Sequence, residues 1–322
     1  MSRQDSQQLA HTNGYALLSH RIMARISGPG TDKFVQGQFT QHVDEVTSDQ
    51  SLRAAACTPK GRAYCLTRLV RDGEDLLLDL DASQAESTVS HLKKYLMLFR
   101  GTTMETLSAA RIIGLIGEAA AASVAGDSAH SLTQPGQTLK VGDSHLIRIE
   151  NTADNTARYE WWQPTGEHSV PEDAPEIDVE KWQISSIAAG VPWLTEASQE
   201  AYVPQMLNLQ HLQGVHFKKG CYTGQEVIAR MHFLGQLKKS LYRLSFNNTQ
   251  QPPAVGSKLL ADGKNVGEVV NALLTGEHEG QMLAVMRHDA SAKVLAIDGM
   301  EGAKIQLEQL PYAVPEQQPS DT

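Results

Sequence analysis

Long apolar runs, disulfide frameworks and metal-binding cysteine pairs are all missing from this sequence of 322 residues. No run of ~18 uninterrupted apolar residues is present to span a bilayer, and residues 1–20 lack the apolar stretch of a signal peptide. The three cysteines, Cys57, Cys65 and Cys221, are scattered and form no CxxC pair, which argues against a disulfide scaffold and against a zinc or redox motif. We therefore expect a soluble cytoplasmic protein with free thiols and no membrane contact. Because a stable iron–sulfur cluster generally takes about four cysteine ligands, we also expect no stable metal of its own.

Positive charge is scarce as well. The chain has 28 Lys and Arg against 37 Asp and Glu, a formal net charge of -9. An acidic protein repels a polyanion unless its cations are clustered, so we expect little direct binding of nucleic acid. Residues 218–243 are the exception, with six Lys or Arg and a single acid.

A GxGxxG fingerprint is absent, which argues against a dinucleotide fold, whereas short strands and helices alternate as in an α+β protein. A capping box of Ser83 and Glu86 predicts a helix start, with Leu92 and Leu96 on the buried face and an end at Gly101. The remaining pattern predicts strands over 22–26, 52–57, 63–70, 76–80, 112–116, 146–149 and 159–163, and helices over 31–37, 118–125 and 179–189. After residue 241, short apolar runs separated by turns predict a small all-β domain, a barrel or a sandwich.

The domain boundaries follow from this change of texture. A two-lobed α+β region is expected over 15–238, with a discontinuous first domain and lobes of roughly 15–105 and 106–238. A C-terminal β-barrel is expected over 239–312. Residues 313–322 are polar and are expected to form a flexible tail.

Cys221 is the strongest candidate for a functional side chain. Two nearby glycines allow backbone N–H groups to approach a ligand, and the composition of 225–231 predicts that a helix begins just after the turn. With Lys218 and Lys219 beside it, such a position favours the thiolate. The plain alternative is a solvated loop followed by an ordinary helix pair of Glu226 and Arg230.

A second alternative uses histidine. His216 and His232 are near enough in sequence to serve Cys221 as bases in a hydrolase-like Cys/His pair. Lone histidines near an aromatic residue are more often structural, so we do not favour this hypothesis.

Several segments together resemble the YgfZ folate-binding protein family. The segment Lys218–Glu226 carries that family's KGCY-[TS]-GQE signature, which is long and specific. Six further segments match the family in the same order, which is not expected by chance. They are Phe34–Thr40 (F-L-Q-G-Q-x-T), Cys57–Arg62 (C-x-x-K-G-[KR]), Leu92–Tyr95, Ala189–Pro192, Val203–Leu209 and Leu310–Tyr312.

The resemblance implies a fold and a role. This family is similar to the aminomethyltransferase (T protein) of the glycine cleavage system, which implies a three-domain ring whose central hole holds tetrahydrofolate. It also includes an iron–sulfur assembly factor, which implies a role in maintaining iron–sulfur client enzymes such as tRNA methylthiotransferases. Trp182 falls at the family's folate pocket, and Arg21 replaces a second aromatic residue there.

The resemblance and the local chemistry together give our candidate residues. A folate presents a flat pterin and an anionic tail, to which an aromatic surface and positive charge are suited. We expect Cys221 to act as the functional thiol with Lys219, Glu226 and Arg230. The expected folate-binding residues are Trp182, Arg21, Gln205, Lys218, Tyr222 and Gln225.

One departure from the aminomethyltransferases bears on activity. Their catalytic aspartate follows the turn between the first strands, but here Arg62 to Cys65 contain no carboxylate and the next one is Asp72. Without that group an acid/base contribution of about 10²–10⁴ in rate is lost, so we expect no glycine-cleavage activity. Three hypotheses remain: a folate-binding accessory protein, which we favour; a folate-dependent one-carbon transferase or demethylase; and an adaptor for which folate is incidental.

Overall fold

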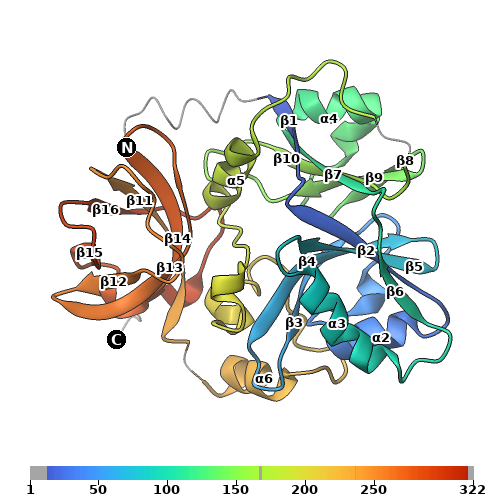
Figure 1. Cartoon of the computed structure of the whole chain (residues 1–322), viewed down its shortest axis with the longest axis horizontal. Coiled ribbons are helices and arrows are strands. Elements are labelled where there is room, and N and C mark those ends of the chain that lie inside the picture. The colour runs from blue at the N-terminus through green and yellow to red at the C-terminus, as the bar shows by residue number, and fades with distance from the viewer. Residues whose placement is uncertain (1–12, 167–168, 236, 318–322) are drawn as a thin grey trace.

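The computed structural model describes residues 13–166, 169–235 and 237–317, and Figure 1 shows that they form three antiparallel sheets with helices packed around them. The expectations for residues 1–12 and 318–322 lie outside the described residues. No helix in the described ranges is long and apolar enough to cross a membrane. The α+β prediction is confirmed, but sheets alone do not define domains, so the boundaries at 105 and 238 stay predictions.

The first sheet has the strand order β3-β4-β5-β2-β6. Its buried face carries the apolar residues of the first core cluster and is covered by two helices. The strand and helix predictions for this region are confirmed to within two residues, except for the end of α3, and β6 was not predicted. The elements are β2 (Arg21–Ser27), α2 (Thr31–Gln38), β3 (Leu52–Cys57), β4 (Ala63–Asp72), β5 (Asp75–Asp81), α3 (Ala85–Leu96) and β6 (Thr103–Thr106).

The capping-box prediction for α3 is wrong. Gln84 is the N-cap, and no side chain caps the helix. The Ser83 hydroxyl donates instead to Asp81, which also accepts the Ser83 backbone N–H at 2.9 Å. This local turn at the end of β5 competes with the cap for the serine side chain. The helix also ends earlier than expected, at Leu96, and a turn follows it.

The second sheet has the order β1-β7-β10-β9-β8, with β10 in its interior. Because side chains alternate along a strand, Arg158, Glu160 and Trp162 share one face of β10, and Trp161 lies on the other. The elements are β1 (Gly14–Leu17), β7 (Arg111–Ile116), α4 (Glu118–Ala125), β8 (Thr138–Val141), β9 (Ser144–Ile149), β10 (Arg158–Gln163) and α5 (Val179–Ala188).

The third sheet has the order β15-β12-β13-β14-β11-β16 and curls into a half-barrel (Figure 1). Within the described residues the two edge strands, β15 and β16, do not pair with each other, so the expected barrel is not closed. The elements are α6 (Gln225–Phe233), which precedes the sheet, β11 (Lys239–Asn247), β12 (Lys258–Ala261), β13 (Lys264–Leu274), β14 (Glu279–Arg287), β15 (Leu295–Ile297) and β16 (Lys304–Glu308).

Part of the expected flexible tail is held against this sheet. Gln317 donates from its amide to the Ser240 hydroxyl at 2.7 Å and to the Leu241 carbonyl at 2.8 Å. Glu316 accepts from His211 at 2.9 Å, and Val314 is buried. The expectation of a free tail therefore does not hold for residues 313–317.

Candidate functional site

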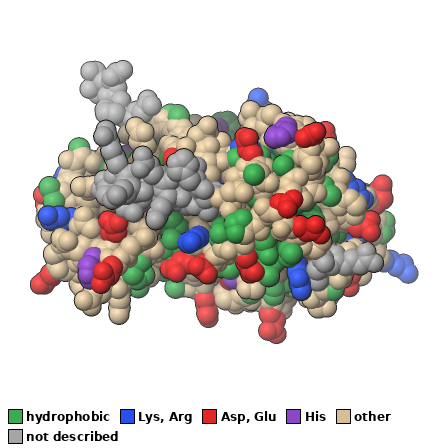
Figure 2. Space-filling model, turned by 90° about the horizontal axis from the view of Figure 1, so that it is seen from above, with side chains coloured by type: hydrophobic (Ala, Val, Ile, Leu, Met, Phe, Trp, Pro, Cys, Tyr) green, Lys and Arg blue, Asp and Glu red, His purple; other side chains and the backbone are tan. Residues whose placement is uncertain are grey.

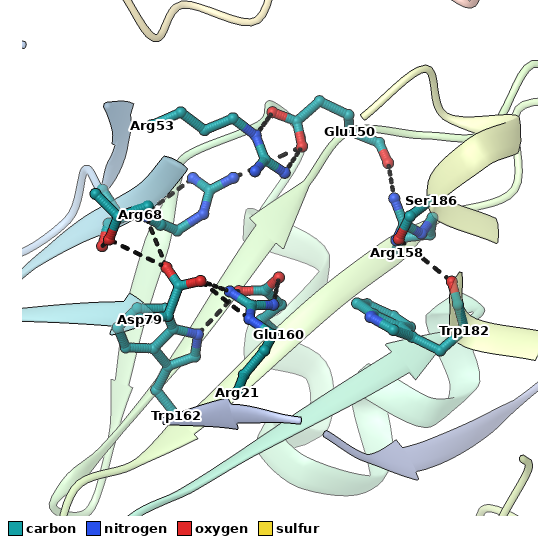
Figure 3. A network of polar contacts seen from close by, with 12 residues as sticks. Arg21, Arg53, Arg68, Asp79, Glu150, Arg158, Glu160, Trp162, Trp182 and Ser186 are labelled. Carbon is teal, nitrogen blue, oxygen red and sulfur yellow. Dashed lines mark hydrogen bonds and ion pairs between the residues drawn. The ribbon is translucent and has the colours of Figure 1, made fainter. Parts of the chain in front are cut away.

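A polar cavity lies where the first and second sheets meet, beside α5 and the loop that follows it. Its walls come from strands β2, β3, β4, β5, β9 and β10, helices α3 and α5, and residues 191–194. Buried charges from both sheets face one another here (Figure 3). Of the residues expected to bind folate, Trp182 and Arg21 line this cavity.

Trp182 is fixed by close packing. Its indole lies directly over Gly114 of β7, where an added Cβ would be only 2.5 Å from the ring. The guanidinium of Arg158 lies 4.5 Å from the ring centroid, a cation–π distance. With 3% of its surface exposed, Trp182 is an edge of the cavity wall rather than an open platform.

Arg21 joins two buried carboxylates across the two sheets. It donates to Asp79 of β5 at 2.5 Å and to Glu160 of β10 at 2.6 Å. Glu160 also accepts the indole N–H of Trp162 at 2.9 Å. Burial alone would raise the pKa of Glu160, but the neighbouring arginines outweigh burial and hold that pKa well below its usual value. Glu160 is therefore ionised and fully paired.

A second ion pair, Arg53 with Glu150, lies farther along the same junction. Arg53 of β3 donates two hydrogen bonds to the Glu150 carboxylate, at 2.7 and 2.6 Å, a bidentate geometry. Burial would raise the pKa of Glu150, but Arg53 outweighs burial and lowers the pKa to about 2. Arg68 lies 3.6 Å from the same carboxylate.

Arg158 is the third arginine of the cavity, and its hydrogen-bond partners are neutral groups, whereas Arg21 and Arg53 contact carboxylates. Its Nη2 donates to the Ser186 hydroxyl at 2.6 Å and its Nη1 to the Glu150 carbonyl at 3.3 Å. Its buried Nε has no hydrogen-bond partner within residues 13–166, 169–235 and 237–317. Burial lowers the pKa of Arg158 to about 9.

The signature segment lies elsewhere, between α2 and α6. Lys219 is buried, and its ammonium donates to the carbonyls of Gln36, Phe39 and Gln41 at 2.7, 2.6 and 2.6 Å. It thereby satisfies carbonyls at the C-terminal end of α2, where a cation is stabilising. Burial lowers the pKa of Lys219 to about 7. Tyr222 packs beside it, with the ring centroid 4.8 Å from the ammonium.

Two glycines bring the signature segment against the β3–β4 turn. Gly224 has φ +86°, and an added Cβ would meet the Thr58 carbonyl at 2.6 Å and Gly61 at 3.1 Å. Gly61 has φ +71° and touches Val227 of α6. Three of the family-like segments therefore meet at one point, because each backbone comes within reach of the next.

The other candidate residues of this region point in different directions. Gln205 donates to the Ile228 carbonyl at 2.7 Å and anchors α6, and Gln225 accepts the Tyr222 backbone N–H at 3.3 Å. The side chains left exposed are Cys221, Lys218, Glu226 and Arg230. In the described part of the chain no ion pair joins Glu226 to Arg230.

The histidines near the signature have other partners. His216 lies 3.0 Å from Glu45, and His232 stacks on Phe217 with ring centroids 3.6 Å apart. No hydrogen bond links either of them to Cys221 in the described ranges, so the geometry of a Cys/His pair is not present there.

The structure thus separates the candidate residues into two places. Trp182 and Arg21 lie in the cavity, and the other eight lie around α6. Besides Arg21, the charged cavity residues Arg53, Asp79, Arg158 and Glu160 were not predicted from the sequence. The half-buried Trp193, which also lines the cavity, was not predicted either. A charged residue inside an apolar strand, as in Leu76–Leu80 or Arg158–Gln163, was the available signal.

Comparison with known proteins identifies the family. A tRNA-modifying protein YgfZ of Escherichia coli O7:K1 (strain IAI39 / ExPEC) is 30% identical over 305 residues, covering 91% of both chains. The protein of the same name from Escherichia fergusonii is 30% identical over 299 residues. This chain belongs to the YgfZ family. No family model matches the chain.

The fold of this YgfZ family member is shared with a solved aminomethyltransferase. The glycine cleavage system aminomethyltransferase T from Bartonella henselae superposes with a TM-score of 0.67, covering 96% of this chain and 88% of that one. At 14% identity this likeness concerns the fold alone. In this chain the functional candidates must therefore be judged from its own residues.

Proposed function

We propose that this protein is a folate-binding accessory protein that supports tRNA modification by maintaining iron–sulfur client enzymes, such as tRNA methylthiotransferases, in the cytoplasm. Its relatives are named as tRNA-modifying proteins, and its fold resembles that of an aminomethyltransferase. The observation that carries the folate part is the cavity, which combines Trp182 and Trp193 with a buried arginine whose donor is unpaired.

The cavity's residues fit a reduced folate. A pterin is flat and carries both donors and acceptors, and a folate tail carries carboxylates. Ligand sites of this kind pair apolar and aromatic walls with a few fixed polar groups. Trp193 supplies a half-exposed ring whose backbone is pinned by Asn271 of β13. Bound tetrahydrofolate would supply one-carbon chemistry, for which this chain must add its own acid or base.

Two of the three carboxylates that line the cavity, Asp79 and Glu160, are poorly suited to that task, and the third, Asp81, accepts the Ser83 backbone N–H at 2.9 Å. Asp79 accepts from Arg21 and from the Arg68 backbone N–H at 2.7 Å, and Glu160 is paired as described. Cys65 also lines the cavity, but burial raises the pKa of its thiol, so it is not a nucleophile at neutral pH. These observations favour an accessory role over a one-carbon transferase or demethylase.

We propose that client enzymes bind to the region around α6. Cys221 is exposed there, as are Lys218 and Arg230, and it lies on a turn that Lys219 and Gly224 hold in place. Acidic side chains are spread across the face seen in Figure 2, which is unfavourable for a polyanion. The exposed thiol supports a protein client at α6, and the acidic face argues against tRNA contact on that face only, because α6 lies at the bottom of Figure 1, away from the face seen from above in Figure 2.

Fluorescence tests the folate part. Tetrahydrofolate is expected to quench tryptophan emission of the wild type, and Trp182→Phe to lose much of that quench, because the indole borders the cavity. Trp161→Phe is the matched control, since Trp161 lies on the face of β10 opposite to the cavity residues Arg158 and Glu160, and in another core cluster than Trp182. An undiminished quench in Trp182→Phe would place the ligand elsewhere, and Kd weaker than millimolar would favour the adaptor hypothesis.

Complementation tests the client part. A strain lacking the gene is expected to show reduced methylthiolation of tRNA, and the wild-type protein is expected to restore it. Cys221→Ala is expected to fold normally and fail to restore it, whereas Lys264→Ala, which removes an exposed lysine of β13, is the control and is expected to restore it. Full rescue by Cys221→Ala would show that the signature serves folate binding or packing, with Lys219, Gln225, Glu226 and Arg230 to be tested next.

A further inference from the structure

The cavity's three arginines differ in how their charge is compensated. Arg21 contacts two carboxylates at 2.5 and 2.6 Å, and Arg53 forms a bidentate pair with Glu150. Arg158 has no carboxylate within ion-pair distance in the described part of the chain. Its two partners, the Ser186 hydroxyl and the Glu150 carbonyl, are both neutral.

Arg158 is nonetheless one of the most deeply buried side chains, with 1% of its surface exposed. A buried cation without a counter-charge, and a buried N–H without an acceptor, are both costly. Among the residues that the structure describes, none accepts a hydrogen bond from the buried Nε of Arg158. Because Arg158 lines the cavity, a molecule within the cavity is positioned to provide an acceptor.

We infer that Arg158 is the specificity-determining residue of the cavity and donates to an acceptor oxygen of the bound ligand. This inference rests on the proposed folate-binding function and deepens it. In a folate the acceptor is either the pterin carbonyl or a carboxylate of the glutamate tail. Both offer the same chemistry, an oxygen that accepts a charge-assisted hydrogen bond.

Trp182 and Ser186 hold the guanidinium of Arg158 in a fixed orientation. Trp182 lies against it at 4.5 Å, and Ser186 fixes Nη2 while itself contacting the Trp182 carbonyl at 3.3 Å. Both come from successive turns of α5, so the helix orients the arginine of β10 (Figure 3). Neither Asp79 nor Glu160 is free to neutralise Arg158 instead, because Arg21 holds both.

The plain alternative is that Arg158 only ties β10 to α5. Arg148 of the adjacent strand β9 offers a matched control, because it is buried, its Nε also lacks a partner among the described residues, and it is not part of the cavity wall. Its hydrogen bond to Arg158 goes to the backbone carbonyl, at 3.1 Å, and not to the guanidinium. Removing either guanidinium should cost stability, but only the loss of Arg158 should weaken ligand binding.

The test measures Kd for tetrahydrofolate by calorimetry in the wild type, Arg158→Gln and Arg148→Gln. The expected result is an about 10- to 100-fold weaker Kd in Arg158→Gln and a change of less than about 2-fold in Arg148→Gln. If Arg158→Gln does not fold, Arg158→Lys is used; it keeps the charge but lacks the planar fork, so an about 10-fold loss is expected. Equal Kd values in the wild type and a folded Arg158 variant would overturn the inference and leave the proposed function standing.

Two fragments distinguish the source of the oxygen. Binding of 6-methyltetrahydropterin and of p-aminobenzoylglutamate is compared in the same variants. If the pterin fragment loses affinity in the Arg158 variant, the acceptor is the pterin carbonyl; if the glutamate fragment does, it is the tail carboxylate. Failure of the wild type to bind tetrahydrofolate at all would overturn the proposed function, and this inference with it.

Discussion

The three thiols of this protein lie in very different surroundings. Cys57 and Cys65 have 1% and 5% of their surface exposed, and burial raises both pKa values, whereas Cys221 is exposed. Since the thiolate is the reactive form and must also be reachable, iodoacetamide at neutral pH should label Cys221 well before the other two. Peptide mass spectrometry measures this. In urea all three should label, and equal native labelling would contradict the prediction.

Lys219, which is part of the signature, is expected to stabilise the fold. Lys219→Met leaves three carbonyls without their donor, so the free energy of unfolding should fall by about 2–4 kcal/mol. Lys218→Met is the control, because Lys218 is exposed and its loss should change stability by less than about 0.5 kcal/mol. Urea denaturation of both variants checks this, and similar midpoints would refute it.

At the scale of elements, the packing of α6 on the β3–β4 turn depends on Gly224. Gly224→Ala puts a side chain at φ +86° and 2.6 Å from the Thr58 carbonyl, so a loss of about 2–4 kcal/mol is expected. Hydrogen exchange should also quicken over residues 218–233. The matched control is Gly220→Ala, where the nearest atom is 3.8 Å away and little change is expected. Equal stability of the two variants would show that the turn can adjust.

At the scale of the whole molecule, the Arg53–Glu150 pair joins the first and second sheets. The folded pKa of Glu150 is about 2, below its usual 4.5, so the unfolded state binds more protons between these values. Stability from this group is therefore complete above pH 4.5 and is lost as pH falls towards 2. A shift of this size corresponds to about 3 kcal/mol.

Glu150→Gln tests this dependence. The variant should be less stable than the wild type at pH 6, and the difference between them should narrow by pH 3. Denaturant unfolding at both pH values measures it. A constant difference across that range would show that the pair does not couple the sheets to pH.

The sequence by itself determined the local structure and the family of this protein. An apolar run before a turn predicted β3 to the residue, an Ala-rich stretch predicted α4 to the residue, and the signature around Cys221 identified the relatives later found by comparison. Both are local properties, because propensity, turn residues and motif letters lie within a few consecutive positions. Ser83 marks the limit even here, since a hydrogen bond to Asp81 overrides its expected cap.

Only the tertiary structure decided which residues share a site. It separated Trp182 from the basic segment, buried Lys219 under α2, and brought Arg21, Asp79 and Glu160 together from strands of two sheets. Sequence spacing does not reveal such meetings, because they depend on how sheets pack and on which face each side chain takes. The charge of the cavity is therefore set by residues that are distant in sequence and held in place by packing. No sequence pattern distinguishes Arg158 from the other charged residues of the strands, because the burial of its Nε depends on the packing of α5 against β10.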